Sequence, residues 1–172
     1  VEKNNLGDNT QIYYLSDHGD NIGERDFWGK SNFYEESVGI PCIIKGPGIP
    51  EGKTSKTPIS LIDVYPTIIQ TIGGTPEAKP GASLVDLANA EDDLERLVFS
   101  EYHAAGAATG AFMIRKGHWK FIYYVSQRPQ LFNLANDPGE LRDLGVDLKL
   151  EYIRKQLVAE LRSICDPETV DA

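Results

Sequence analysis

The sequence predicts an α/β fold: part of a mixed, mostly parallel sheet with helices, followed by a small four-stranded antiparallel sheet that a helix covers. Residues 11–15 form a nearly continuous run of β-branched and aromatic side chains, typical of a strand buried on both faces of a parallel sheet. Residues 97–134 contain four short apolar runs whose short connections favour antiparallel pairing. Residues 148–164 carry apolar side chains at helical spacing.

The first half of the chain adds one strand and one helix to this outline. Residues 40–45 read as a short core strand that the turn-rich residues 46–52 close. Residues 60–72 have helical apolar spacing, with Pro66 near the first turn and two glycines as the stop. Polar and breaker-rich stretches near residue 90 predict a boundary between a main α/β domain, residues 1–90, and an α+β subdomain, residues 91–172.

The second half predicts the small sheet. Its strands are expected at residues 97–102, 111–116, 118–125 and 130–134, with a hairpin turn around Gly117. The final segment is an amphipathic helix that we expect to cover one face of this sheet. The side chains on its apolar stripe are Leu148, Tyr152, Ile153, Leu157, Leu161 and Ile164.

Composition limits the classes of partner. The chain has 172 residues, enough for a domain with a real core, and a formal net charge of -9, which argues against a nucleic-acid partner. A local positive spot at Arg25 and Lys30 still leaves room for a small anion. No stretch approaches the roughly 20 apolar residues of a membrane span, so a soluble protein is expected. The sequence does not decide whether the protein resides in the cytoplasm or the periplasm. It also allows the chain to form a homo-oligomer.

An Asp-His pair follows the first strand. Asp17 and His18 stand where ligand sites of parallel sheets lie, and we expect Gly19 to permit the turn that lets both face one ion. A carboxylate suits calcium, magnesium or manganese, and the imidazole tilts the choice toward manganese without excluding calcium. In the alternative interpretation, Asp17 only caps the turn and His18 is solvated.

The residues around this pair resemble a known family. Residues 16–31, beginning Ser-Asp-His-Gly and ending Trp-Gly-Lys-Ser, are similar to the C-terminal half of the sulfatases in the alkaline phosphatase superfamily, especially the choline sulfatase and phosphonate monoester hydrolase branch. The resemblance continues through most of the chain. The other segments that carry it are residues 33–37, 40–41, 46–49, 60–67, 113–121, 130–134 and 136–140.

This resemblance implies specific roles. Asp17 and His18 would be ligands of a divalent metal ion, with calcium or manganese as first candidates and magnesium as a further one. Lys30 would act in catalysis by reaching an oxygen of the bound sulfate or phosphate ester. Residues 1–90 would form the C-terminal part of an alkaline phosphatase-like catalytic domain. The implied reaction is hydrolysis of a small sulfate ester at a metal-bound formylglycine.

The chain departs from the family pattern at the nucleophile. The family's formylglycine arises from the Cys of a Cys-x-Pro-Ser-Arg motif, but Cys42 is followed by Ile-Ile-Lys and Cys165 by Asp-Pro-Glu. Neither cysteine can take that role, and the family's first acidic metal ligands also lie upstream of the Asp-His pair. We therefore expect the chain to be a C-terminal fragment that has no activity alone and at most weak metal affinity.

Several alternatives stay open. Sulfate and phosphate esters share tetrahedral geometry, so a phosphonate monoester hydrolase or phosphodiesterase fits equally, as does a non-catalytic binding module with a degenerate site. His103, ahead of a Gly/Ala-rich loop, is a candidate substrate-binding residue, although such a loop can also be a plain surface connection. Glu35 and Glu36 are expected on a solvated face, and Phe27 with Trp28 as packing anchors.

Overall fold

The computed structural model describes residues 2–104 and 106–171 and divides into two compact units. Unit 1 comprises Val1–Asp17 and Ile40–Leu94, and unit 2 comprises His18–Gly39 and Glu95–Ala172. Residues 18–39 therefore pack with the C-terminal residues of the chain. The predicted boundary between residues 90 and 91 concerns the domains of the parent protein and stays a prediction.

Unit 1 contains a two-stranded ribbon. Strands β1 (Ile12–Leu15) and β4 (Cys42–Lys45) pair antiparallel, with Ile12 opposite Lys45. Both strands were predicted, but the expectation of a parallel strand buried on both faces is wrong in this chain, because Tyr14 is 62% exposed. A ribbon of two strands cannot enclose its own faces, so alternate side chains stay in solvent.

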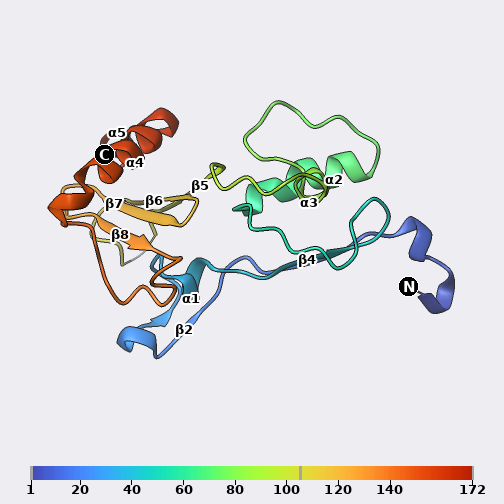
Figure 1. Cartoon of the computed structure of the whole chain (residues 1–172), viewed down its shortest axis with the longest axis horizontal. Coiled ribbons are helices and arrows are strands. Elements are labelled where there is room, and N and C mark those ends of the chain that lie inside the picture. The colour runs from blue at the N-terminus through green and yellow to red at the C-terminus, as the bar shows by residue number, and fades with distance from the viewer. Residues whose placement is uncertain (1, 105, 172) are drawn as a thin grey trace. The chain divides into compact units, whose positions relative to one another are not determined.

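Two helices pack together in unit 1. Helix α2 (Val64–Thr71), preceded by the 3₁₀ turn η4 (Leu61–Asp63), confirms the helix predicted for residues 60–72, and α3 (Leu84–Asn89) was not predicted. Buried Asp63 accepts hydrogen bonds from the backbone N–H groups of Ser60 at 2.8 Å and Ala82 at 2.9 Å. The bond from Ser60 fixes the start of the helical segment. The bond from Ala82 holds the residues just before α3 beside the start of that segment (Figure 1). The short 3₁₀ turns η1 (Glu2–Asn4) and η2 (Gly7–Asn9) precede β1.

Unit 2 contains the predicted four-stranded antiparallel sheet. Its order is β5 (Leu97–Tyr102), β6 (Ala111–Lys116), β7 (Trp119–Tyr124) and β8 (Gln130–Asn133). The predicted hairpin between β6 and β7 is confirmed, and Gly117 at its tip has a φ of 56°, a value that favours glycine. The 3₁₀ turn η5 (Leu148–Leu150), α4 (Glu151–Ile164) and α5 (Pro167–Val170) follow, with α4 lying against the sheet (Figure 1).

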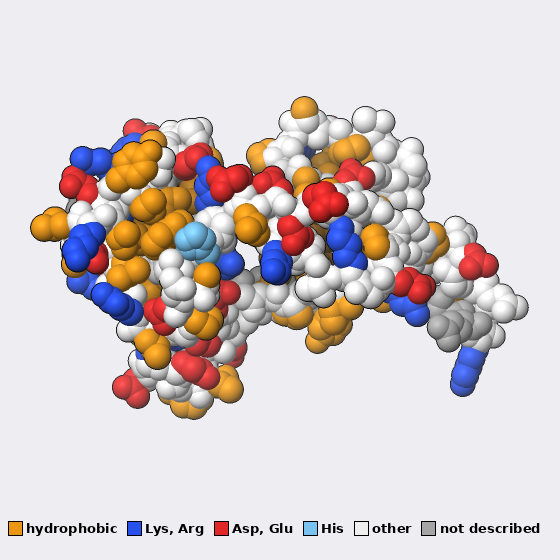
Figure 2. Space-filling model, viewed as in Figure 1, with side chains coloured by type: hydrophobic (Ala, Val, Ile, Leu, Met, Phe, Trp, Pro, Cys, Tyr) orange, Lys and Arg blue, Asp and Glu red, His pale blue; other side chains and the backbone are white. Residues whose placement is uncertain are grey.

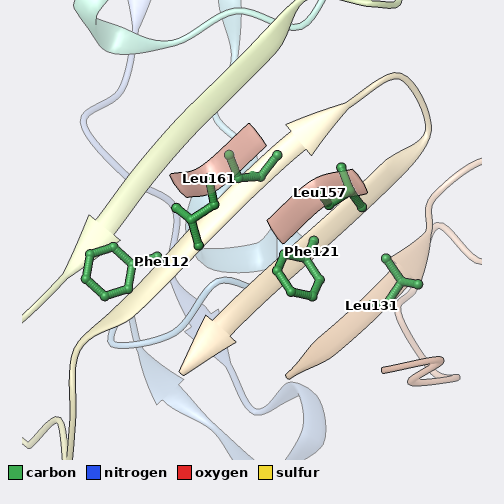
Figure 3. Close-up of a cluster of buried hydrophobic side chains, with 6 residues drawn as sticks. Phe112, Phe121, Leu131, Leu157 and Leu161 are labelled. Carbon is green, nitrogen blue, oxygen red and sulfur yellow. The ribbon is translucent and has the colours of Figure 1, made fainter. Parts of the chain in front are cut away.

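The core of unit 2 lies between the sheet and α4. Figure 3 shows Leu157 and Leu161 of the helix above side chains of three strands. The buried cluster is Phe112, Ile114, Phe121, Leu131, Leu157 and Leu161. Each such side chain stabilises the fold by about 1.5–3 kcal/mol relative to exposure. Two members of the predicted stripe are exposed, Leu148 by 82% and Tyr152 by 70%, whereas Leu150 and Ile153 pack against the cluster. Tyr152 is rotated about 100° around the helix axis from Ile153, so its side chain faces solvent.

The opposite face of the sheet is covered as well. Phe33 packs there with Met113, Ile122 and Phe132, which alternate along their strands with the side chains that face α4. The sheet thus has two buried faces, and the segment around Phe33 serves as its second cover. This segment also carries the residues that follow the Asp-His motif, so the core of unit 2 positions them.

Among the described residues, no helix combines the length and the apolar character needed to cross a membrane. Lys and Arg side chains are interspersed with Asp and Glu on the face shown in Figure 2, rather than gathered into one basic stripe.

Candidate functional site

A small hairpin connects the two halves of the motif. Strands β2 (Asn21–Ile22) and β3 (Trp28–Gly29) pair antiparallel around the 3₁₀ turn η3 (Glu24–Asp26). The fully buried Asn21 donates its side-chain N–H to the carbonyl of Gly29 at 2.6 Å, which closes the hairpin. As a result, Lys30 returns to the side chain of His18 although twelve residues separate them in the chain.

The imidazole of His18 has one nitrogen fixed by the backbone. Its Nδ1 lies 2.6 Å from the carbonyl oxygen of Gly19, and its Nε2 contacts the Nζ of Lys30. The carbonyl can only accept and the ammonium can only donate, so this network assigns the proton to Nδ1 and a lone pair to Nε2. A histidine that donates one N–H to a backbone carbonyl and presents the other nitrogen as a base is oriented as metal-bound histidines are.

Helix α1 (Glu35–Val38) holds both ends of this pair. The backbone N–H of Gly19 donates to the carbonyl of Ser37 at 2.8 Å, and the Ser37 hydroxyl donates to the carbonyl of Lys30 at 2.6 Å. A Cβ on Gly19 would stand 2.1 Å from the carbonyl oxygen of Glu36. Glycine was expected here because it permits a turn of the backbone. The φ of Gly19 is not in the positive region, and the close approach of two backbones is what requires glycine.

A buried ion cluster ties α1 to the sheet. The Nζ of Lys120, on β7, lies 2.6 Å from Glu35 Oε1 and 2.7 Å from Glu140 Oε1, and donates to the Phe33 carbonyl at 2.7 Å. Lys120 is 1% exposed and the Glu140 side chain 0%. Glu140 also accepts the backbone N–H of Glu35 at 2.6 Å. Burial is the main cause that raises the pKa of Glu140, and the Lys120 charge opposes it.

The expectation that Glu35 and Glu36 form a solvated face is wrong. Glu35 pairs with Lys120, and Glu36 Oε2 lies 2.8 Å from Arg25 Nη1, so both carboxylates are used inside unit 2. Adjacent residues on a short helix do point to different sides, as predicted, but each side here meets a cation from another element. Lys120, the one charged residue in the aromatic and aliphatic strand 119–124, was the sequence signal for this cluster.

The predicted positive spot is reduced to Lys30. Arg25 pairs with Glu36, donates to the Gly139 carbonyl and stacks 4.2 Å from the centre of the Tyr34 ring. These contacts make it part of the packing of unit 2, so it is not available to hold an anion. Lys30 is exposed and close to His18, as an anion-contacting residue would have to be.

The hairpin aromatics were predicted to be packing anchors. Trp28 is 77% exposed, because β2 and β3 form a ribbon with no layer over that face, so the expectation is wrong for it. Phe27 is partly exposed and contacts the Tyr34 ring with centroids 6.0 Å apart. His103 packs edge-on against the ring of Phe112 and lies 3.7 Å from a carboxylate oxygen of Glu101.

The metal-ligating side chains of the described residues are not clustered. Asp17, exposed at the end of unit 1, has one carboxylate oxygen 3.5 Å from the Ser16 hydroxyl. Within residues 2–104 and 106–171, no group of three or more His, Cys, Asp or Glu side chains is arranged to hold a metal ion. Both cysteines are free, and burial is the main cause that raises the pKa of the Cys42 and Cys165 thiols, which makes them poor nucleophiles at neutral pH.

The curated relatives with similar sequences are sulfatases. Choline-sulfatase of Rhizobium meliloti is 42% identical over 142 residues, which cover 80% of this chain and 27% of the relative. Human arylsulfatase K is 34% identical over 175 residues, 95% of this chain and 32% of the relative. The solved structure of BT4656 in complex with its substrate D-glucosamine-2-N,6-O-disulfate matches with a TM-score of 0.84 at 28% identity, covering 95% of this chain and 35% of that one.

These matches agree with the resemblance read from the motif and confirm the α/β fold class. The chain spans about a third of the length of the curated relatives it matches. Residues 23–166, which include Lys30 and the whole four-stranded sheet, match the family described as N-sulphoglucosamine sulphohydrolase, C-terminal. The chain therefore belongs to this C-terminal family of the sulfatases.

Proposed function

We propose that this chain is the C-terminal part of an enzyme that hydrolyses sulfate esters, and that it supplies His18, Asp17 and Lys30 to the active site. The observation that carries the proposal is the contact between Lys30 and the Nε2 of His18, with Nδ1 bonded to the Gly19 carbonyl. In this contact the Nε2 lone pair accepts from the Lys30 ammonium, so a metal ion bound at Nε2 would displace the ammonium, which would then stand next to the metal site and face an anionic ester.

In this proposal, His18 and Asp17 are two ligands of a divalent cation, with calcium or manganese as first candidates. Such an ion polarises an ester oxygen and lowers the pKa of a nucleophile bound to it. The nitrogen and carboxylate donors fit these ions, but hard ions usually take about six ligands. Further ligands and the formylglycine nucleophile are therefore assigned to the rest of the parent protein.

Lys30 has the role of balancing negative charge on the group that is transferred. Its backbone is held by the Ser37 hydroxyl, which keeps its side chain beside His18. With Nε2 engaged by a metal ion, the ammonium would be free to contact an oxygen of the ester and to stabilise negative charge that develops in the transition state.

Replacement of Lys30 by Ala in the full-length parent tests this role. We expect turnover of 4-nitrophenyl sulfate to fall about a hundredfold to a thousandfold, with the melting temperature nearly unchanged. The matched control is Lys155→Ala, which removes an exposed lysine of α4 that pairs only with Glu151 among the described contacts. An unchanged rate with a lowered melting temperature would show that Lys30 is structural. Phenyl phosphonate esters assayed in parallel decide between the sulfatase and the phosphonate hydrolase.

Metal content tests the role of His18 independently of activity. In the parent protein, His18→Ala is expected to lower the bound metal per protein molecule, measured by elemental analysis after dialysis, whereas His118→Ala on the β6–β7 turn is expected to leave it unchanged. Equal metal content in both variants would remove His18 from the ligand set. The 172-residue chain alone is expected to show no turnover of an aryl sulfate.

A further inference from the structure

Helix α1 contacts both the proposed active site and the four-stranded sheet of unit 2. Near its end, Ser37 accepts the Gly19 N–H through its carbonyl and donates its hydroxyl to the Lys30 carbonyl. At its start, Glu35 Oε1 lies 2.6 Å from the Nζ of Lys120 on β7. The helix has only four residues, about one turn. A displacement of its first residue is therefore passed on to both bonds that hold the site.

The start of α1 is fixed in both place and orientation. The Lys120 ammonium can donate three hydrogen bonds, and it has three acceptors: the Glu35 and Glu140 carboxylates at 2.6 and 2.7 Å and the Phe33 carbonyl at 2.7 Å. Glu140 also accepts the backbone N–H of Glu35 at 2.6 Å, and Arg115 Nη1 lies 3.6 Å from the Glu35 carboxylate. The first residue of the helix therefore cannot shift or rotate without breaking a bond to this cluster.

The backbone around the cluster is strained. Among the described residues, five other than glycine have a positive φ, and three of them lie at this junction: Arg25 at 52°, Asp26 at 61° and Glu140 at 51°. Such a φ brings Cβ close to the backbone and costs free energy, so it persists only where the surroundings enforce it. Arg25 is held by a carboxylate of α1 and by the carbonyl of Gly139. The turn at residues 139–140 thus holds both α1 and the hairpin that carries the motif.

Stability alone does not require this cluster. Lys120 shares its face of the sheet with apolar side chains, among them Ile122 and Phe132. Burying charges costs solvation free energy, and replacing a buried ion cluster with apolar side chains of similar volume is often neutral or stabilising. Apolar contacts are not directional, whereas a hydrogen-bonded ion pair fixes the position of each partner. The cluster is therefore suited to hold one helical turn at a defined place.

We infer that Lys120, Glu35 and Glu140 are positioning residues for the proposed reaction. They hold α1, and α1 holds Lys30 at a fixed place beside His18. The inference rests on the proposed function, because the place of Lys30 affects the rate only if its ammonium contacts the ester. It gives the C-terminal sheet a part in the reaction, since Lys120 belongs to β7 and Glu140 follows β8.

Glu35→Gln in the parent protein tests this inference. The amide has the shape of the carboxylate but lacks its charge, so the helix keeps its packing and loses its anchor on Lys120. We expect kcat for 4-nitrophenyl sulfate to fall about tenfold to a hundredfold with KM nearly unchanged, because a small displacement of a catalytic group mainly weakens contacts made in the transition state. The matched control is Glu160→Gln, which should leave kcat unchanged. Glu160 lies 2.7 Å from Lys116 of the same sheet and is 39% exposed, against 35% for Glu35.

A double variant separates positioning from loss of folding. If Glu35 acts through Lys30, Glu35→Gln should cause little further loss of kcat in a Lys30→Ala background. A general effect on the fold would instead lower kcat by the same factor in both backgrounds. Ser37→Ala displaces Lys30 by a second route, because it removes the hydroxyl bond to the Lys30 carbonyl and leaves the ion cluster intact. It should behave like Glu35→Gln in both backgrounds.

The 172-residue chain provides a readout that does not depend on activity. The nuclear Overhauser effect between the imidazole protons of His18 and the Cε protons of Lys30 should weaken in Glu35→Gln and Ser37→Ala and persist in Glu160→Gln. An effect of equal strength in all three variants, or kcat losses that multiply in the Lys30→Ala background, would overturn the inference while the sulfatase stands. If the parent turns over no sulfate ester but the Overhauser effect weakens as expected, the proposed function falls and the placement of Lys30 by the cluster stands.

Discussion

Replacing Lys120 by Met should destabilise unit 2 strongly at neutral pH. Met fills the space of the lysine stem, so the change removes the charge and leaves little cavity. Glu140, whose side chain is fully buried, loses its cation, and the Phe33 carbonyl loses a donor at 2.7 Å. Removing one partner of a buried ion pair typically costs about 3–5 kcal/mol.

Protonation of Glu140 sets a ceiling on the electrostatic part of this cost. The ordinary pKa of the group is 4.5, so taking up a proton at pH 7 costs about 3 kcal/mol at 1.36 kcal/mol per pH unit. The lost hydrogen bond to the Phe33 carbonyl adds about 1 kcal/mol or more. We therefore expect the free energy of unfolding to fall by about 4 kcal/mol at pH 7.

The loss should shrink at lower pH. Burial already raises the pKa of Glu140 in the folded state, and removing Lys120 raises it further. A raised folded pKa contributes stability that is present below the unfolded value of 4.5 and is lost as the pH rises through the folded value. At pH 5 the ceiling is below about 1 kcal/mol, so most of the electrostatic cost disappears.

Urea unfolding followed by tryptophan fluorescence measures this, because both tryptophans, Trp28 and Trp119, belong to unit 2. The matched control is Lys155→Met, which breaks an exposed pair with Glu151 and is expected to change stability little. Equal losses in the two variants, or a loss in the Lys120 variant that is the same at pH 5 and pH 7, would refute the reasoning.

Two further predictions concern other parts of unit 2. Gly19→Ala places a Cβ 2.1 Å from a backbone oxygen, so we expect the free energy of unfolding to fall by about 1–3 kcal/mol or more. Gly139→Ala, whose Cβ would meet only a side chain at 3.6 Å, is the control in the same urea assay. Similar losses in both variants would show that the backbone relaxes around the new Cβ at no cost. Glu168 has its pKa lowered to about 2, first by the Arg162 guanidinium and then by the Tyr123 hydroxyl. A lowered pKa in the folded state contributes stability that is present above pH 4.5 and is lost as the pH falls toward 2. Glu168→Gln should therefore make the melting temperature depend less on pH over that range. A variant whose melting temperature is as pH-dependent as that of the wild type would contradict this.

The sequence by itself determined the sheet of unit 2 and its main helix. The short apolar runs within residues 111–116 and 118–125, the Gly117 turn and the stripe through Leu157 and Leu161 are local patterns, and local patterns are enough when strands are joined by short turns. The resemblance to sulfatases was likewise visible from the residues around His18 and Lys30, and the family match over residues 23–166 confirms the resemblance.

Only the tertiary structure decided how that motif is held. The pairing of Lys120 with Glu35 and Glu140 joins residues far apart in the chain, and no spacing rule connects residue 35 to residue 120 or 140. The same holds for Gly19, whose requirement comes from the backbone of Glu36 rather than from its own φ. Sequence patterns report which face of an element is apolar, whereas the partner of a buried charge depends on which elements meet, and that is settled only when the chain packs.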